Sequence, residues 1–155
     1  MFIIDTCFWN HLRDLYQEIG LDLRPTIEKA NWGYTEALLK EYQNYNIDDF
    51  IPLESGVIFP LSNNTFIDIQ KKYPMIQELD ISDQTIFAIA IRSDTIILSD
   101  DGELLMECLG TKIKALRLPP FMLSLAESGK INKKIVKRAL NYWQERKLYK
   151  LSDIK

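Results

Sequence analysis

The sequence predicts an α/β fold of three layers, α/β/α, in which helices cover both faces of a mostly parallel sheet of four to five strands. Short apolar or β-branched runs alternate along the chain with longer segments that have helical spacing, and this order is typical of parallel sheets covered by helices. The sequence contains no internal repeat, low-complexity tract or linker. Its 155 residues suit one domain with a full core, so we expect residues 1–155 to form a single domain.

The first half of the chain has clear signals for where its elements begin and end. Gly20 and Pro74 are expected to end helices, and Thr35 is expected to cap one. Pro52 cannot donate a backbone hydrogen bond, so a strand around it would lie at an edge of the sheet. The expected elements are a buried strand at 2–4, a helix at 7–20, a short helix or loop at 26–32, a helix at 35–45, a short strand at 49–55 and a helix at 63–74.

The second half continues the alternation. Ser82 is the expected cap of a mostly buried helix, and Pro119 with Pro120 opens a later helix, because proline fits the first turn. Asn132 begins the last helix, which is basic and amphipathic. The expected elements are a helix at 82–92, a central strand at 95–98, a helix at 102–110, a strand at 112–118, and helices at 119–129 and 132–147.

Composition and single residues argue against several classes of protein. No apolar run is long enough to cross a membrane, and the amino terminus is too short and too acidic for a signal peptide, so we expect a cytoplasmic protein without a membrane partner. Cys7 and Cys108 lack zinc-site spacing and are expected to be reduced core thiols. His11 is the one histidine, so no Ser–His or Cys–His pair suggests itself. There is no glycine-rich phosphate loop to support nucleotide hydrolysis.

Charge is distributed unevenly along the chain. Residues 1–110 carry a balance of −12 and residues 111–155 a balance of +9. Such asymmetry fits binding to a polyanion, or two halves that attract each other in the fold. The last helix and the residues before it contain a basic stripe with helical spacing, which either attracts RNA phosphates or is an ordinary solvated face. Its members are Lys130, Lys133, Lys134, Lys137 and Arg138. The three tryptophans, Trp9, Trp32 and Trp143, are interpreted as core residues rather than stacking platforms.

Acidic residues stand where two predicted strands end and where a buried helix begins. Asp5 follows the first strand, Asp100 and Asp101 follow the central strand, and Asp83 lies in the first turn of the helix at 82–92. Each of these acids could cap a helix. However, one cap suffices after the central strand, and the second carboxylate there repels the first. Because functional crevices lie beyond the carboxyl ends of parallel strands, we expect these acids to converge.

A fourth acid is expected from the helix at 35–45. Glu36 can pair with Lys40 one turn later, which is an ordinary solvated arrangement. Glu41 shares a face with apolar residues, and a carboxylate there needs a reason, so it is favoured over Glu36. Converging carboxylates repel one another unless a cation neutralises them, and hard oxygen ligands suit Mg²⁺ or Mn²⁺.

These acids and their surroundings resemble the motifs of PIN-domain proteins. "FIIDT" looks like the opening Asp-Thr of that family, "TEALLKEY" is similar to its second motif with Glu41 at the acidic position, and "SDQTIFAIA" is similar to the third. "IILSDDGEL" resembles the fourth, with Ser99 and Asp101 at the motif positions and Asp100 between them. The order and approximate spacing hold over residues 2–110, and "KIKALRLPPFMLSLAESGKI" resembles a longer bacterial and archaeal branch. Two features depart from the pattern, since Cys7 stands where Asn is frequent and the segment 46–80 is long.

The resemblance implies a metal-dependent ribonuclease, possibly one that acts as the toxin of a toxin–antitoxin pair. It implies that Asp5, Glu41, Asp83 and Asp101 bind one or two Mg²⁺ or Mn²⁺ ions, with Asp100 supporting or sharing the site. Metal-activated water would then attack an RNA phosphodiester, and Thr6 and Ser99 would orient ligands or the water. An antitoxin protein and a homodimer partner are further implications of the resemblance. The main alternative is a non-catalytic PIN-like module that binds RNA or protein and keeps the acids as helix caps.

Overall fold

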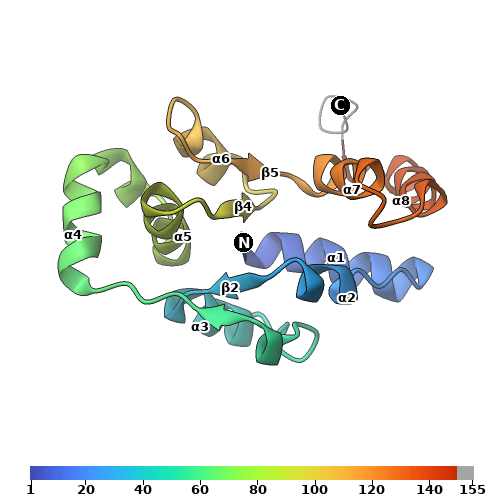
Figure 1. Ribbon diagram of the computed structural model, residues 1–155, viewed down its shortest axis with the longest axis horizontal. Coiled ribbons are helices and arrows are strands. Elements are labelled where there is room, and N and C mark those ends of the chain that lie inside the picture. The colour runs from blue at the N-terminus through green and yellow to red at the C-terminus, as the bar shows by residue number, and fades with distance from the viewer. Residues whose placement is uncertain (150–155) are drawn as a thin grey trace.

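One parallel sheet organises the fold. The computed structural model describes residues 1–149, and in this range the chain forms a five-stranded, all-parallel sheet in the order β3-β2-β1-β4-β5, flanked by eight helices (Figure 1). The predicted three-layer α/β/α class is confirmed. The strands are β1 (Phe2–Ile4), β2 (Trp32–Tyr34), β3 (Val57–Ile58), β4 (Ile96–Leu98) and β5 (Ala115–Leu116).

The chain leaves the middle of the sheet in two directions. From β1 it moves through β2 to β3 at one edge, and it later returns to β4 and β5 on the other side of β1. The two central strands pair directly, with Phe2 beside Ile96 and Ile4 beside Leu98. Right-handed crossovers in opposite directions place their helices on opposite faces. This arrangement creates a topological switch point between β1 and β4, where open α/β sheets usually bind ligands.

Strand β2 was not predicted. The segment 26–32 was expected to be a short helix or loop, and the structure has helix α2 (Arg24–Lys29) followed directly by β2. Its three residues are too few for a periodic pattern to reveal. Gly33 fits there for a packing reason, because an added Cβ would lie 2.6 Å from the Val57 carbonyl oxygen of β3.

The prediction of a strand at 49–55 is wrong. That segment ends in a 3-10 turn, η1 (Leu53–Ser55), and the edge strand is β3, which begins two residues later. Val57 and Ile58 are both exposed, so β3 shows no alternation of buried and exposed side chains. Strand β3 is therefore defined by its pairing with β2 and not by a pattern in its own sequence. The pairing continues beyond the strand, where Phe59 N donates a hydrogen bond to Tyr34 O.

Two helices begin directly after the residues that were expected to cap them. Thr35 caps α3 by accepting a hydrogen bond from Leu38 N, and Asn132 caps α8 by accepting one from Lys134 N, as predicted. Gly20 ends α1 with a φ of 67°, a conformation that glycine adopts without strain. The remaining bounds are α1 (Thr6–Ile19), α3 (Glu36–Asn44), α4 (Asn63–Lys72), η2 (Pro74–Glu78), α5 (Ile81–Arg92), α6 (Gly102–Cys108), α7 (Leu118–Glu127) and α8 (Lys133–Arg146).

Several predicted boundaries shift in the second half, and two of the shifts concern a cap and a strand. Ser82 is not the cap of α5, because the helix begins at Ile81 with Asp80 at the N-cap position. The predicted strand at 112–118 is shortened to β5, since Leu118 already belongs to α7. The prediction of a basic amphipathic last helix is confirmed for α8, whose buried face consists of Val136, Ala139, Tyr142 and Trp143.

The core lies between the sheet and its helices. Central strand residues such as Ile3, Ile97 and Leu98 are inaccessible to solvent, and all three tryptophans are buried, as predicted. Residues 82–90 of α5 are buried throughout. Helices α4 and α8 lie at opposite ends of the long axis (Figure 1). Within residues 1–149, no helix is both long and apolar enough to cross a membrane.

Candidate metal centre

Three carboxylates converge at the switch point of the sheet. Asp5, Asp83 and Asp101 each offer an oxygen atom, and these oxygen atoms all lie within 4.8 Å of one another. They come from three separate segments, namely the end of β1, the first turn of α5 and the residues after β4. They open onto a pocket of about 250 Å³, whose lining residues are Asp5, Thr6, Cys7, Asn10, Glu41, Tyr45, Asp80, Asp83 and Asp101.

Asp5 has both of the roles considered for it. It follows β1 directly, and its Oδ1 accepts a hydrogen bond of 2.7 Å from Thr6 N, which caps α1. Its Oδ2 accepts a hydrogen bond of 2.8 Å from the Ser99 hydroxyl, and the Cys7 thiol lies 3.3 Å from the same oxygen. Capping fixes the carboxylate in the pocket, so the structural role and the position at the acid cluster are compatible.

Ser99 connects the two central strands at the site. Its hydroxyl donates to Asp5 and also accepts a hydrogen bond of 3.0 Å from Asp101 N. Asp101 in turn caps α6, because its Oδ1 accepts a hydrogen bond of 2.9 Å from Glu103 N. The hydroxyl predicted to orient the acids is thus fully buried and bonded to both sides of the switch point.

The electrostatics of the cluster oppose three free negative charges. Asp83 is 5% exposed, and its burial together with the charges of Asp5 and Asp101 raises its pKa to about 9. Burial also raises the pKa of Asp5 to about 6, although hydrogen bonds from Ser99 and Cys7 act in the opposite direction. Without a cation, the Asp83 carboxyl therefore holds a proton near neutral pH that an ordinary aspartate would release.

The residues of the cluster fit a hard divalent cation. Five of the nine residues that line the pocket are acids, and none of the described lining residues is a lysine or arginine. Carboxylate oxygens from rigid strand and helix ends are the donors that Mg²⁺ and Mn²⁺ prefer. A bound cation would offset both the burial and the repulsion that raise the pKa values of Asp5 and Asp83.

Glu41 lies at the rim of the same pocket, outside the triad of converging oxygens. It is half-buried on α3, where its Oε1 accepts a hydrogen bond from Thr6 and its Oε2 accepts one from Ser82. Both hydroxyls come from elements that carry an acid of the cluster, so they fix Glu41 relative to it. Glu36 is exposed and lines a neighbouring hollow but not the acid pocket.

Asp100 has its partners away from the triad. Its Oδ1 accepts a hydrogen bond of 3.2 Å from Leu118 N and lies 3.6 Å from Arg117 Nε, and its Oδ2 accepts one of 2.7 Å from the Tyr149 hydroxyl. Arg117 also donates to the Asp100 carbonyl oxygen at 3.0 Å. The ring of His11 contacts the ring of Tyr149, and its Nε2 lies 3.9 Å from Asp100 Oδ2. Asp100 thus supports the site by fixing the loop that carries Asp101.

Four residues of the pocket were not predicted as site residues, namely Cys7, Asn10, Tyr45 and Asp80. Asp80 precedes α5 by one residue and lines the pocket with Asp83. Its spacing of three residues from Asp83 is the signal that could have found it, since residues three apart share a helix face. Tyr45 also lines the pocket, with 63% of its surface exposed, and no pattern in the sequence distinguishes it.

The predicted basic stripe lies at the other end of α1. Lys133, Lys134 and Lys137 are exposed on α8, and Lys130 is exposed in the preceding turn. Arg138 donates to the carbonyl oxygen of Ile19 at the carboxyl end of α1. Asp5 lies at the amino end of this 14-residue helix, which is about 20 Å long. The stripe is therefore separated from the acids by roughly the length of α1.

Comparisons with models of known protein families, with curated proteins and with solved structures find no match to this chain.

Proposed function

We propose that this protein is a metal-dependent ribonuclease that hydrolyses RNA phosphodiester bonds with Mg²⁺ or Mn²⁺. The observation that supports this most strongly is the convergence of Asp5, Asp83 and Asp101 at the switch point of a parallel sheet. A divalent ion held there would lower the pKa of a coordinated water and offset the charge of a phosphate. The motif resemblance to PIN-domain nucleases supports the same reaction.

Each residue of the site has a distinct part in this proposal. Asp5, Asp83 and Asp101 would bind the ion, and Ser99 keeps Asp5 and Asp101 at a fixed separation through its two hydrogen bonds. Glu41 would complete the ligand set or accept a hydrogen bond from the attacking water. Proton transfer would use carboxylates and water, because the one histidine, His11, is not among the residues that line the pocket.

RNA is the proposed substrate because the molecule has separate acidic and basic regions. The acid pocket alone repels a polyanion, whereas the exposed lysines of α8 attract one by releasing its counterions. At about 20 Å from the acids, they favour a long substrate over a small phosphate ester. We further propose that the protein acts as the toxin of a toxin–antitoxin pair, with an antitoxin protein that covers the acid pocket, and that it forms a homodimer.

The nuclease proposal is tested by incubating a mixed RNA pool with Mg²⁺ or Mn²⁺. We expect cleavage by the wild type, no cleavage by Asp5→Asn or in EDTA, and full cleavage by Asp68→Asn. Asp68 is an exposed acid on α4 outside the pocket and provides a matched control. Equal cleavage by wild type and Asp5→Asn would contradict the proposal. For the toxin role, expression of the wild type should slow growth, and expression of Asp5→Asn should not.

A second candidate is a non-catalytic module that binds RNA or protein. It is favoured by the observation that Asp5 and Asp101 each accept a hydrogen bond from a helix backbone, so both have a structural use without a metal ion. Metal binding separates the two candidates. Failure of Mn²⁺ to bind or to raise the melting temperature would favour the non-catalytic module.

A further inference from the structure

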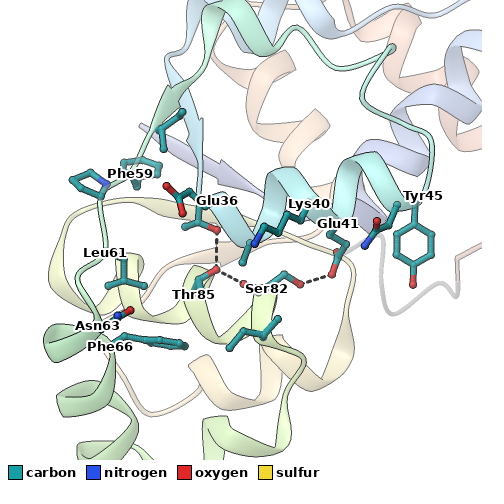
Figure 2. Close-up of a pocket in the computed structure, with 16 residues that line it drawn as sticks. Glu36, Lys40, Glu41, Tyr45, Phe59, Leu61, Asn63, Phe66, Ser82 and Thr85 are labelled. Atoms are coloured by element: carbon teal, nitrogen blue, oxygen red, sulfur yellow. Dashed lines mark hydrogen bonds between the residues drawn. The ribbon is translucent and has the colours of Figure 1, made fainter.

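A second, larger hollow adjoins the acid pocket. It has a volume of about 750 Å³ and lies between α3 on one side and the segment from β3 to α4 on the other (Figure 2). It shares Glu41 and Tyr45 with the acid pocket, so the two hollows are adjacent. We call it the α3–α4 groove, and its lining residues are Thr35, Glu36, Ala37, Lys40, Glu41, Asn44, Tyr45, Ile58, Phe59, Pro60, Leu61, Asn63, Phe66, Ile81, Ser82 and Thr85.

A chain of hydrogen bonds links the polar side chains on the α5 side of the groove. The hydroxyls of Thr35 and Thr85 are 2.8 Å apart, Thr85 donates to the carbonyl oxygen of Ser82 at 2.7 Å, and Ser82 donates to Glu41 (Figure 2). Thr35, Ser82 and Thr85 are buried and already have hydrogen-bond partners. The chain of hydrogen bonds links this side of the groove rigidly to the acid at the rim of the metal centre.

The walls of the groove combine apolar and polar groups. Phe59 and Phe66 are half-buried on the side of β3 and α4, and Tyr45 stands on the opposite side at the junction with the acid pocket (Figure 2). Free hydrogen-bonding groups come from exposed residues on both sides, namely the amides of Asn44 and Asn63 and the amine of Lys40. Ile58 and Ile81 are 54% and 59% exposed at the walls, so considerable apolar surface is accessible there.

A nucleotide base matches this combination. Bases are flat and stack on aromatic side chains, while their edges exchange hydrogen bonds with amides. The volume lies within the range of small-molecule sites. Lys40 adds a positive charge next to Glu41. That charge would attract the phosphate that connects a base bound in the groove to the acid pocket. A base within a duplex cannot enter, because both of its faces are stacked.

We infer that the α3–α4 groove binds an unpaired base of the RNA, next to the phosphodiester held at the acid cluster. This inference rests on the proposed function and adds a substrate class, which is single-stranded RNA or the loops of folded RNA. In this arrangement Tyr45, which lines both hollows, would lie beside the nucleotide that extends from the groove to the acid pocket.

The test measures binding without cleavage, in an Asp5→Asn background. The probe is a fluorescently labelled, unstructured RNA oligonucleotide, and its Kd is measured by fluorescence anisotropy. Phe66→Ala should weaken binding by about tenfold or more, the size expected for loss of one stacked base. Asn63→Asp should weaken it as well, because the amide donor is lost and a negative charge is added. Asn63 is exposed in the first turn of α4, where an aspartate favours the helix, so this variant is expected to fold.

Two controls make the result specific. Tyr16→Ala removes an aromatic residue of α1 that is 43% exposed and lies outside the groove, and it should leave Kd unchanged. A duplex of the same sequence should bind equally to all variants. If both groove variants bind the single strand as the parent does, the inference is overturned and a protein partner becomes the better occupant. If those variants keep RNA binding while the wild type still cleaves RNA, only the groove assignment fails and the nuclease proposal stands.

Discussion

Asp100 and Asp101 are neighbours in the sequence, yet they belong to two electrostatically different regions. Asp100 is 5% exposed in its side chain and is compensated by the protein itself, through Arg117, Leu118 N and Tyr149. Asp101 faces Asp5 and Asp83, with no cation from the described lining residues of its pocket. Asp100 is thus a buried charge that is paired within the protein, whereas the half-buried Asp101 lies among other carboxylates.

The comparison also explains why a double acid stands after β4. One carboxylate fixes the loop to α7 and to Tyr149, and the other extends from that fixed loop toward the acids of β1 and α5. A precise metal site needs supporting interactions that hold its ligands in place. Asp100 provides this support from the opposite side of the loop.

The largest effect on activity is expected from a substitution in the acid cluster of Asp5, Asp83 and Asp101. Asp83→Asn should reduce metal-dependent RNA cleavage by at least about 100-fold, because even changes outside the ligand shell of a metal cost up to that much. The same substitution should raise the melting temperature of the metal-free protein at neutral pH, because the buried Asp83 carboxyl, with its raised pKa, must take up a proton on folding and asparagine need not. Cleavage assays and thermal denaturation in EDTA measure the two effects, with Asp68→Asn as the control.

A substitution of Asp100 should have the opposite effect on the stability of the metal-free protein. Asp100→Ala should lower the free energy of unfolding by about 3 kcal/mol, because it leaves Leu118 N and the Tyr149 hydroxyl without their charged acceptor. Urea denaturation in EDTA measures this change. A metal-free protein that is more stable with Asp100→Ala than the wild type would mean that Asp100 belongs electrostatically to the acid cluster.

The pH dependence of stability should differ with and without metal. The pKa values of Asp5 and Asp83 are raised above those in the unfolded chain, so the folded, metal-free protein binds more protons than the unfolded one. Its stability should therefore be highest at acid pH and fall as pH rises through about 6 and then about 9. Saturating Mg²⁺ should reduce or reverse this fall, because the ion replaces the protons. Denaturation curves across this range, with and without Mg²⁺, provide the measurement.

A smaller effect is expected from the hydroxyl that anchors Asp100. Tyr149→Phe removes one hydrogen bond to a buried carboxylate and should cost about 1–2 kcal/mol of stability. Because burial and Asp100 both raise the pKa of Tyr149, its hydroxyl stays protonated and the anchor should persist at alkaline pH. The affinity for Mn²⁺ should change less in Tyr149→Phe than in Asp101→Asn. The reverse order would indicate that the ion contacts the Asp100 side of the loop.

The convergence of the acids could be predicted from the sequence because it depends only on where strands and helices end or begin. Asp5 and Asp101 follow strands, and the ends of parallel strands meet at one edge of the sheet. Sequence reasoning could not find the orientation of Asp100, since that depends on Arg117 and Tyr149, which are 17 and 49 residues away. It also missed β2 and misplaced the edge strand, because strands of two or three residues are defined by pairing with neighbours.

The most direct test of the account is Mn²⁺ binding by calorimetry near neutral pH, with the isosteric variants Asp101→Asn and Asp100→Asn. We expect the wild type to bind, Asp101→Asn to lose most of the affinity, and Asp100→Asn to keep affinity within about tenfold of the wild type. The two variants differ by one position and remove the same charge, so general electrostatic attraction affects both alike. Equal loss in both variants, or no binding by the wild type, would contradict the assignment of Asp5, Asp83 and Asp101 as a metal centre.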